Sequence, residues 1–214
     1  LSSIFCALPL LQEVRLSFYK VLEDNDCLLT SDMIIKEEFY KHYLQVVSSA
    51  IQTARSAGVG IHTVSLLYFK LLFFWKEPNL GPLSESIRQL LVNIKVLRLR
   101  GVDSRVLKLL SHCAFDLHQL DMCQMEAPEK VIKDFFETNK KSIRSIGFHD
   151  VDIHGLNSLG SSTPLSASVL CRMLDVPQST PCRAADCGCL RWFKEGWRLG
   201  VGEGCSQLST GTSC

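Results

Sequence analysis

The chain has 214 residues, of which 46% are hydrophobic and 21% are charged, and its formal net charge at pH 7 is +1. Such a chain can bury a core of ordinary size. Its balanced charge offers no electrostatic reason to expect nucleic acid or an anionic membrane as partner. The most apolar run, residues 64–75, contains Lys70 and is shorter than the roughly 20 residues of a membrane-spanning helix. We therefore expect this run to lie in a core.

The start of the chain and its cysteines indicate an intracellular protein. The first residue is Leu1 rather than Met, which indicates the interior of a longer protein, and no basic segment precedes the apolar residues 4–11 as in a secretory signal. Four of the ten cysteines stand singly among apolar residues, namely Cys6, Cys27, Cys113 and Cys123. Isolated cysteines are typical of buried free thiols in a reducing compartment. We expect the protein to reside in the cytoplasm or nucleus.

A six-residue pattern, which we call the head, recurs along the chain. Large apolar residues occupy its first, fourth and sixth positions, and polar or charged residues fill most of the gaps. The clearest copy is residues 94–99, where the side chains alternate from Leu97 onward as in a half-buried strand. In chain order the heads are residues 11–16, 61–66, 94–99, 117–122 and 143–148. Each head predicts a short strand.

Between these strands, apolar residues spaced by three and four predict amphipathic helices. The longest begins near Met33 and ends near Gly58 and Gly60. Its apolar face is expected to contain Ile35, Phe39, Tyr43, Val46, Val47, Ala50, Ile51 and Ala54. Shorter helices are expected over residues 83–91, 104–113 and 128–136. The alternation of strands and helices predicts an α/β fold with a parallel sheet.

The spacing of the heads sets the size of each strand–helix unit. The fourth position of the heads falls at Val14, Val64, Leu97, Leu120 and Ile146. The last three lie 23 and 26 residues apart, inside the range of about 20–29 that is typical of leucine-rich repeats. The preceding gap of 33 residues requires a loop insertion around residues 78–82. The first gap of 50 is either two units with one degenerate strand or, as we favour, one unit that holds the long helix.

Three segments, residues 94–102, 117–125 and 143–153, resemble leucine-rich-repeat proteins of an irregular style. The strand-exit asparagine of regular repeats is absent, since Val102, Met125 and Val151 stand near that place. The resemblance implies an irregular solenoid over residues 1–156, with a curved parallel sheet on its concave side and helices on its convex side.

Two further segments, residues 111–121 and 139–146, resemble the C-terminal half of fungal F-box-type proteins. In that family an N-terminal F-box binds a ubiquitin-ligase adaptor and the repeats hold the substrate. No F-box is evident in this sequence, so the role of substrate receptor in a ubiquitin ligase is implied by the resemblance alone.

The variable strand positions are the candidate binding residues, because in such an array they face solvent on the concave side. Arg98 and Arg100 would lie side by side on one strand, and arginine is enriched in interface hot spots. The predicted binding residues are Arg15, Ser65, Arg98, Arg100, Gln119, Asp121, Ser145 and His149, with Glu13, Ser17 and Thr63 beside them. We expect this surface to bind another protein. The alternative is that these residues are merely solvated strand faces.

The remaining segment, residues 157–214, is rich in Ser, Gly and Cys and is expected to be largely disordered. Its weak candidate metal ligands are Cys182, Cys187, Cys189 and Cys205, and a zinc-binding or thiol-rich tail on a structural array is the alternative function. The acidic and histidine side chains of residues 149–154 are expected to face solvent. No Gly-x-Ser-x-Gly motif occurs, and we expect neither catalysis nor a cofactor.

Overall fold

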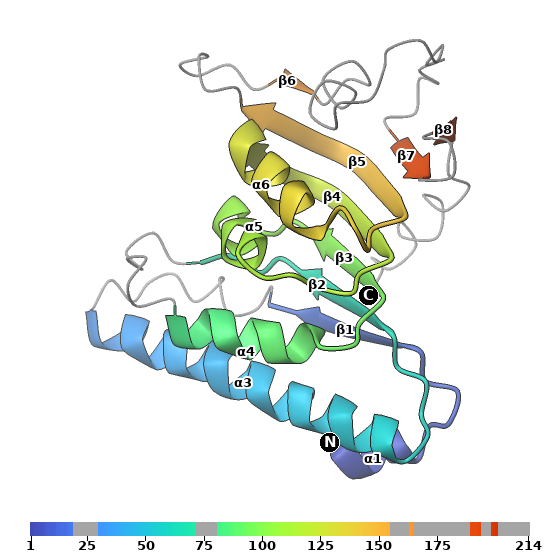
Figure 1. Ribbon diagram of the computed structural model, residues 1–214. Coiled ribbons are helices and arrows are strands. Elements are labelled where there is room, and N and C mark those ends of the chain that lie inside the picture. The colour runs from blue at the N-terminus through green and yellow to red at the C-terminus, as the bar shows by residue number, and fades with distance from the viewer. Residues whose placement is uncertain (19–29, 72–80, 155–162, 165–188, 194–197, 201–214) are drawn as a thin grey trace, which may run out of the picture.

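The computed structural model describes residues 1–18, 30–71, 81–154, 163–164, 189–193 and 198–200 (Figure 1). Five parallel strands form an open sheet in the order of the chain. They are β1 (Glu13–Ser17), β2 (Thr63–Leu67), β3 (Val96–Arg100), β4 (Gln119–Pro128) and β5 (Ser145–His154). The helices are α1 (Ser2–Cys6), α3 (Thr30–Ser56), α4 (Gly81–Leu91), α5 (Ser104–Ser111) and α6 (Glu129–Asn139). The predicted α/β class with a parallel sheet is confirmed.

The five heads lie in register across the sheet. Val14 pairs with Val64, Val64 with Leu97, Leu97 with Leu120, and Leu120 with Ile146. The fourth head positions of the five units therefore form one row across the sheet. Because β1 pairs directly with β2, the 50-residue gap holds one unit with the long helix α3, and the alternative of a degenerate strand between them is excluded.

A repeated backbone arrangement explains why the first two apolar residues of a head are three positions apart. The amides of Lys95 and Val96 both donate to the carbonyl oxygen of His62, at 2.8 and 3.1 Å. The amides of His118 and Gln119 likewise both donate to the carbonyl of Lys95. Two consecutive residues thus share one acceptor on the neighbouring strand, as in a bulge. The side chains of these two residues therefore point away from the core. The alternation of buried and outward side chains begins with the next residue.

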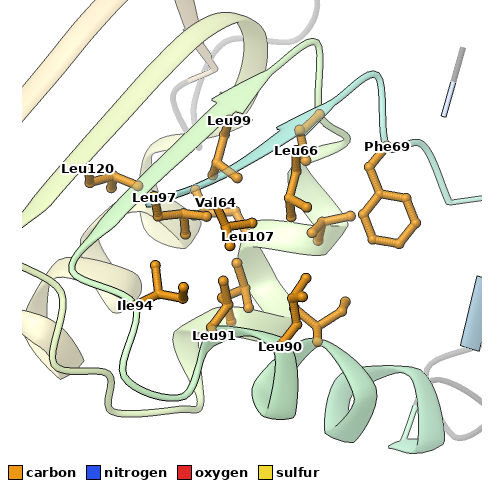
Figure 2. Close-up of a cluster of buried hydrophobic side chains, with 14 of the residues drawn as sticks. Val64, Leu66, Phe69, Leu90, Leu91, Ile94, Leu97, Leu99, Leu107 and Leu120 are labelled. Atoms are coloured by element: carbon orange, nitrogen blue, oxygen red, sulfur yellow. The ribbon is translucent and has the colours of Figure 1, made fainter. Parts of the chain in front are cut away.

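The core lies between the sheet and the helices, as Figure 2 shows for its central part. Leu97 and Leu99 of β3 are almost completely buried, and they face Leu90 and Leu91 of α4 and Leu107 of α5. Burying one such leucine side chain stabilises the fold by about 1.5–3 kcal/mol. The apolar head positions therefore bind each strand to the helices on one side of the sheet.

The buried face of α3 differs from the predicted one. Phe39 and Val46, expected on the apolar face, are 51% and 40% exposed. The buried stripe consists of Tyr40, Leu44, Val47, Ala50, Ile51 and Ala54. The cause lies in the sequence itself: α3 is apolar around more than half of its circumference, so periodicity alone does not select which side meets the sheet. Phe39 instead stacks on Tyr43, with ring centroids 6.2 Å apart.

A buried asparagine fastens the loop that leads into β4. Asn139, at the end of α6, is 2% exposed. Its Oδ1 accepts from the amide of Phe115 at 2.8 Å, and its Nδ2 donates to the carbonyls of Cys113 and Phe135. Without these partners the loop would bury unpaired backbone groups, which is costly.

Three short strands follow β5 in the described part of the chain. They are β6 (Thr163–Pro164), β7 (Cys189–Phe193) and β8 (Arg198–Gly200). β6 and β7 pair with β5 in antiparallel orientation, and β8 pairs with β7. The sequence pattern did not predict these strands. The candidate metal ligands Cys182, Cys187 and Cys205 lie outside the described residues.

None of the helices in the described ranges is both long enough and apolar enough to cross a membrane.

Candidate functional site

The helices α3, α4, α5 and α6 lie on one side of the sheet (Figure 1). Among the described residues no helix covers the other side, which we call the open face. The burial of side chains alternates along β1 and β3, as expected when one face is buried and the other is exposed. The outward side chains of the open face are Glu13, Arg15, Ser17, Thr63, Ser65, Leu67, Val96, Arg98, Arg100, Gln119, Asp121, Cys123, Ser145 and His149. All the predicted binding residues belong to this set.

The central row of the open face joins one residue from each strand. In register across β1 to β5 it reads Arg15, Ser65, Arg98, Asp121 and Gly147. Long charged side chains thus alternate with short ones. The structure brings four of the eight predicted binding residues into this single row.

Glu13 is the centre of an ion-pair network on the open face. Its Oε1 accepts from Arg15 Nε at 2.8 Å and from Ser65 Oγ at 2.7 Å, and its Oε2 accepts from Arg98 Nη1 at 2.8 Å. Partial burial raises the pKa of Glu13, but the hydrogen bonds from Arg15 and Ser65 and the charge of Arg98 outweigh it, so this pKa lies below its usual value. The hydrogen bond to Glu13 also raises the pKa of Arg15.

The Glu13–Arg98 ion pair passes over the intervening strand β2. Neighbouring strands lie about 4.8 Å apart, so β1 and β3 are separated by roughly 10 Å. Two long side chains can close this gap only where the residue between them is short. Ser65 meets that need, and it is only 3% exposed because the ion pair covers it. Sequence reasoning placed Ser65 on this face but did not foresee that it would be covered.

The network continues to β4 and β5. Arg98 Nε lies 3.5 Å from Asp121 Oδ2, and Gln119 Nε2 donates to the same oxygen at 2.7 Å. Asp121 also occupies the space beside Gly147: a Cβ atom on Gly147 would lie 2.6 Å from Asp121 Oδ1. The guanidinium of Arg98 is therefore held between two carboxylates.

A left-handed residue occurs two positions after each of the last four heads; the first two come directly after β2 and β3, and the other two lie within β4 and β5. Tyr68, Gly101, Gln124 and Asp150 have φ values of 56°, 59°, 50° and 53°. For a residue other than glycine this conformation costs about 1–2 kcal/mol. In each unit the next residue is buried and apolar, in the order Phe69, Val102, Met125 and Val151. The left-handed residue thus shifts the alternation by one position, so that two successive side chains point away from the core.

These left-handed residues line a cleft at the carboxyl-end side of the open face. The cleft has a volume of about 720 Å³, and we call it the carboxyl-edge cleft. Its lining includes Tyr68, Lys70, Asp103, Gln124, Glu126, Asp150 and Asp152. The Tyr68 ring packs on Gly101, where an added Cβ would come within 2.7 Å of the ring. Arg100, a predicted binding residue, donates from Nε to Gln124 Oε1 at 2.9 Å beside this cleft.

The opposite edge of the open face, where the strands begin, carries basic residues. The residues that precede the strands are His62, Lys95, His118 and Arg144, and we call them the amino-edge row. Asp116 forms an ion pair with Lys95 and lies 3.7 Å from His118 Nε2. The hydrogen bond from Lys95 lowers the pKa of Asp116, although partial desolvation opposes the shift.

The two predicted binding residues on β5 lie outside the network. Ser145 pairs in register with Phe193 of β7, and among the described residues no group forms a hydrogen bond with its buried Oγ. His149 lies in register beside Cys123 and opposite Cys189 of β7. Burial raises the pKa of the Cys123 thiol, which makes it a poor nucleophile. Within the described ranges, no three His, Cys, Asp or Glu side chains gather as a metal ion would require.

Comparison with known proteins finds no matching family model, no matching curated protein and no matching solved structure. The fold and site therefore define the class on their own: an α/β protein with an open, five-stranded parallel sheet that carries an ordered network of charges on the face opposite the described helices.

Proposed function

We propose that the open face of this chain binds another protein and that the chain has no catalytic role. The observation that supports this most directly is the Glu13–Arg98–Asp121 network, which orders charged side chains from β1 to β4 on the face without helices. Side chains that are already ordered lose little conformational entropy when a partner binds. Arginine in such a setting is a frequent interface hot spot.

We further propose that the architecture is an irregular leucine-rich-repeat array. The support lies in features that recur from unit to unit. Two amides share one carbonyl at the strand entries, and a left-handed residue occurs two positions after each of the last four heads. In a repeat array each unit buries its apolar residues against its neighbours, which leaves the outward strand positions available for recognition. The more specific role, substrate recognition for a ubiquitin ligase, rests on the sequence resemblance and stays a prediction.

The first test compares matched arginine variants in an affinity-capture experiment. Arg98→Gln removes the central cation of the open face, whereas Arg88→Gln removes an arginine that pairs with Glu85 on the helix side. We expect partner recovery, measured by quantitative mass spectrometry, to fall at least fivefold for Arg98→Gln and to stay unchanged for Arg88→Gln. Arg98→Glu is avoided because it would place three carboxylates together with Glu13 and Asp121.

The second test locates the contact directly. A photo-crosslinking amino acid at Val96 lies on the open face, and one at Lys133 lies on the exposed side of α6. A partner that binds the open face crosslinks to position 96 and not to position 133. Equal crosslinking at both positions, together with equal recovery for both arginine variants, contradicts the proposal.

A further inference from the structure

Charge is segregated along the strands of the open face. In three successive units a basic residue at the amino edge is followed eight positions later by an acidic residue at the carboxyl edge. The pairs are Lys95 and Asp103, His118 and Glu126, and Arg144 and Asp152. An extended chain rises about 3.3 Å per residue, so eight residues span at most roughly 26 Å, and less where a left-handed residue such as Gly101 turns the chain. The formally charged residues of these pairs are Lys95 and Arg144 at the amino edge, with Asp116 beside Lys95, and Asp103, Glu126 and Asp152 at the carboxyl edge.

The acidic end is concave. Asp103, Glu126, Asp150 and Asp152 line the carboxyl-edge cleft, and Lys70 is the one basic side chain among the lining residues. Asp103 also forms an ion pair with Arg105 at 2.6 Å, so Glu126, Asp150 and Asp152 are the acidic residues on which the proposal depends. Glu126 and Asp152 pair in register on adjacent strands, which places two like charges side by side. A cationic side chain of a partner would be attracted to both carboxylates. The Tyr68 ring in the cleft wall adds an aromatic surface that favours a cation.

The basic end lies on the surface at the strand entries. His62 and Arg144 are exposed, and Lys95 and His118 are half-buried beside Asp116. The aliphatic part of Lys95 thus lies along the protein while its charge stays near the surface. This row can attract carboxylates of a partner.

We propose that the partner of the open face is a polypeptide segment with separated charges, whose Lys or Arg side chains enter the carboxyl-edge cleft while its Asp or Glu side chains lie on the amino-edge row. The proposal rests on the proposed function and adds the chemistry and direction of the partner. Complementary charges at the two ends of the strands fix the register of an extended segment along them. A uniformly anionic nucleic acid would meet the acidic cleft and be repelled.

A second copy of this chain fits the same charges less well. A two-fold axis that brings Lys95 opposite Asp103 of the other copy also brings Arg98 opposite Arg100, because both pairs are centred on position 99. Like charges would therefore meet at the centre of such an interface.

The test uses two fluorescein-labelled peptides of identical composition. The first has the order Glu-Glu-Glu-Ser-Ser-Ser-Ser-Ser-Ser-Arg-Arg-Arg, and the second carries the same residues with Glu and Arg alternating. Binding to the full chain is measured by fluorescence anisotropy at about 0.15 M salt, where the screening length is near 8 Å. We expect the segregated peptide to bind at least tenfold more tightly than the alternating one. Equal binding of the two, including no binding of either, overturns the proposal.

Variants at each end provide the controls. Glu126→Gln with Asp152→Asn removes two charges from the cleft, and His62→Asn with Arg144→Gln alters the amino-edge row. Each double variant is expected to reduce the preference for the segregated peptide at least fivefold. The matched control, Asp134→Asn with Glu137→Gln, removes two exposed carboxylates from α6 and leaves the preference unchanged. An equal reduction by this control shows general electrostatic attraction and overturns the proposal.

Sedimentation velocity separates the second copy from a different partner. If the chain forms a dimer that each edge variant abolishes and an equimolar mixture of charge-reversed edge variants restores, the occupant is a second copy and the proposal is overturned. If the captured partner survives both edge variants but is lost in Arg98→Gln, the charge-segregation proposal fails while the proposed function stands.

Discussion

Glu13 and Arg98 are 85 positions apart in the sequence, yet Arg98 Nη1 donates to Glu13 Oε2 at 2.8 Å across β2. Ser65 lies beneath the pair and donates to the same carboxylate. This relationship joins three strands on the open face and is the structural reason why its charged residues form an ordered network.

Removing the charge of Glu13 tests the stability of that network. We expect Glu13→Gln to lower the free energy of unfolding by about 0.5–1.5 kcal/mol at pH 7, because exposed ion pairs contribute little and the Ser65 hydrogen bond survives in weakened form. Urea unfolding followed by circular dichroism measures the change. Glu38→Gln is the control, since Glu38 forms an exposed pair with Lys41 at 3.3 Å. A loss for Glu38→Gln as large as that for Glu13→Gln would contradict the special role of Glu13.

The contribution of Glu13 to the free energy of unfolding should decrease as the pH falls. The pKa of Glu13 is lowered in the folded state, so its stabilisation is fully present above the unfolded-state pKa and is lost as the pH falls through the folded-state pKa. The difference in unfolding free energy between wild type and Glu13→Gln should therefore be largest near pH 7 and should shrink below about pH 4.5. Urea titrations at pH 7, 5 and 3.5 measure it. A difference that grows with acidity would refute the network as described.

Glycine is needed at position 147 because the neighbouring Asp121 side chain leaves no room for a Cβ atom, and not because of the backbone conformation. An added Cβ would lie 2.6 Å from Asp121 Oδ1, so Gly147→Ala must displace the Asp121 side chain from Arg98. We expect Gly147→Ala to lower the free energy of unfolding by about 1 kcal/mol only, since the end of the flexible Asp121 side chain can move. Gly60→Ala, with nothing within 4 Å of its Cβ, is the control and should cost less. When Asp121 is also replaced by Ala, Gly147→Ala should lower the free energy of unfolding no more than Gly60→Ala does. A double-mutant cycle measures this coupling.

Gly101 combines two requirements that can be separated by experiment. Its φ of 59° is left-handed, and an added Cβ would lie 2.7 Å from the Tyr68 ring. Gly58 has a φ of 88° and open space around it, so Gly58→Ala reports the conformational cost alone. We expect thermal unfolding to show a loss of about 1 kcal/mol for Gly58→Ala and about 2–4 kcal/mol for Gly101→Ala. Equal losses would mean that the Tyr68 contact is unimportant.

Asn139 should be among the most sensitive polar residues of the fold. Asn139→Ala leaves the amide of Phe115 and the carbonyl of Cys113 without their partners in a buried loop. We expect a loss of about 2–4 kcal/mol, because unpaired buried backbone groups retain their full desolvation cost. Gln89→Ala, which removes an exposed hydrogen bond to Glu85, should cost below about 0.5 kcal/mol. Hydrogen exchange at Phe115 would show whether the loop itself loosens; unchanged protection would contradict the assignment.

The sequence by itself determined where the five parallel strands begin, although not β6, β7 and β8. The head positions Val14, Val64, Leu97, Leu120 and Ile146 form one row of the sheet. The helices between them were also predictable, because apolar periodicity reports which side chains a segment must bury. The outward strand positions followed from the same alternation. These properties are local, so a single sequence contains them.

The tertiary structure alone decided which outward residues meet. The contact of Glu13 with Arg98 depends on the strand register and on the short side chain of Ser65 between them. Sequence rules do not associate residue types such as Tyr68 and Gln124 with positive φ, yet both adopt it here. Together with Asp150 they line the carboxyl-edge cleft. Likewise, the broad apolar surface of α3 is consistent with several orientations until neighbouring elements select one. Such features are set by contacts between distant segments, which local periodicity does not encode.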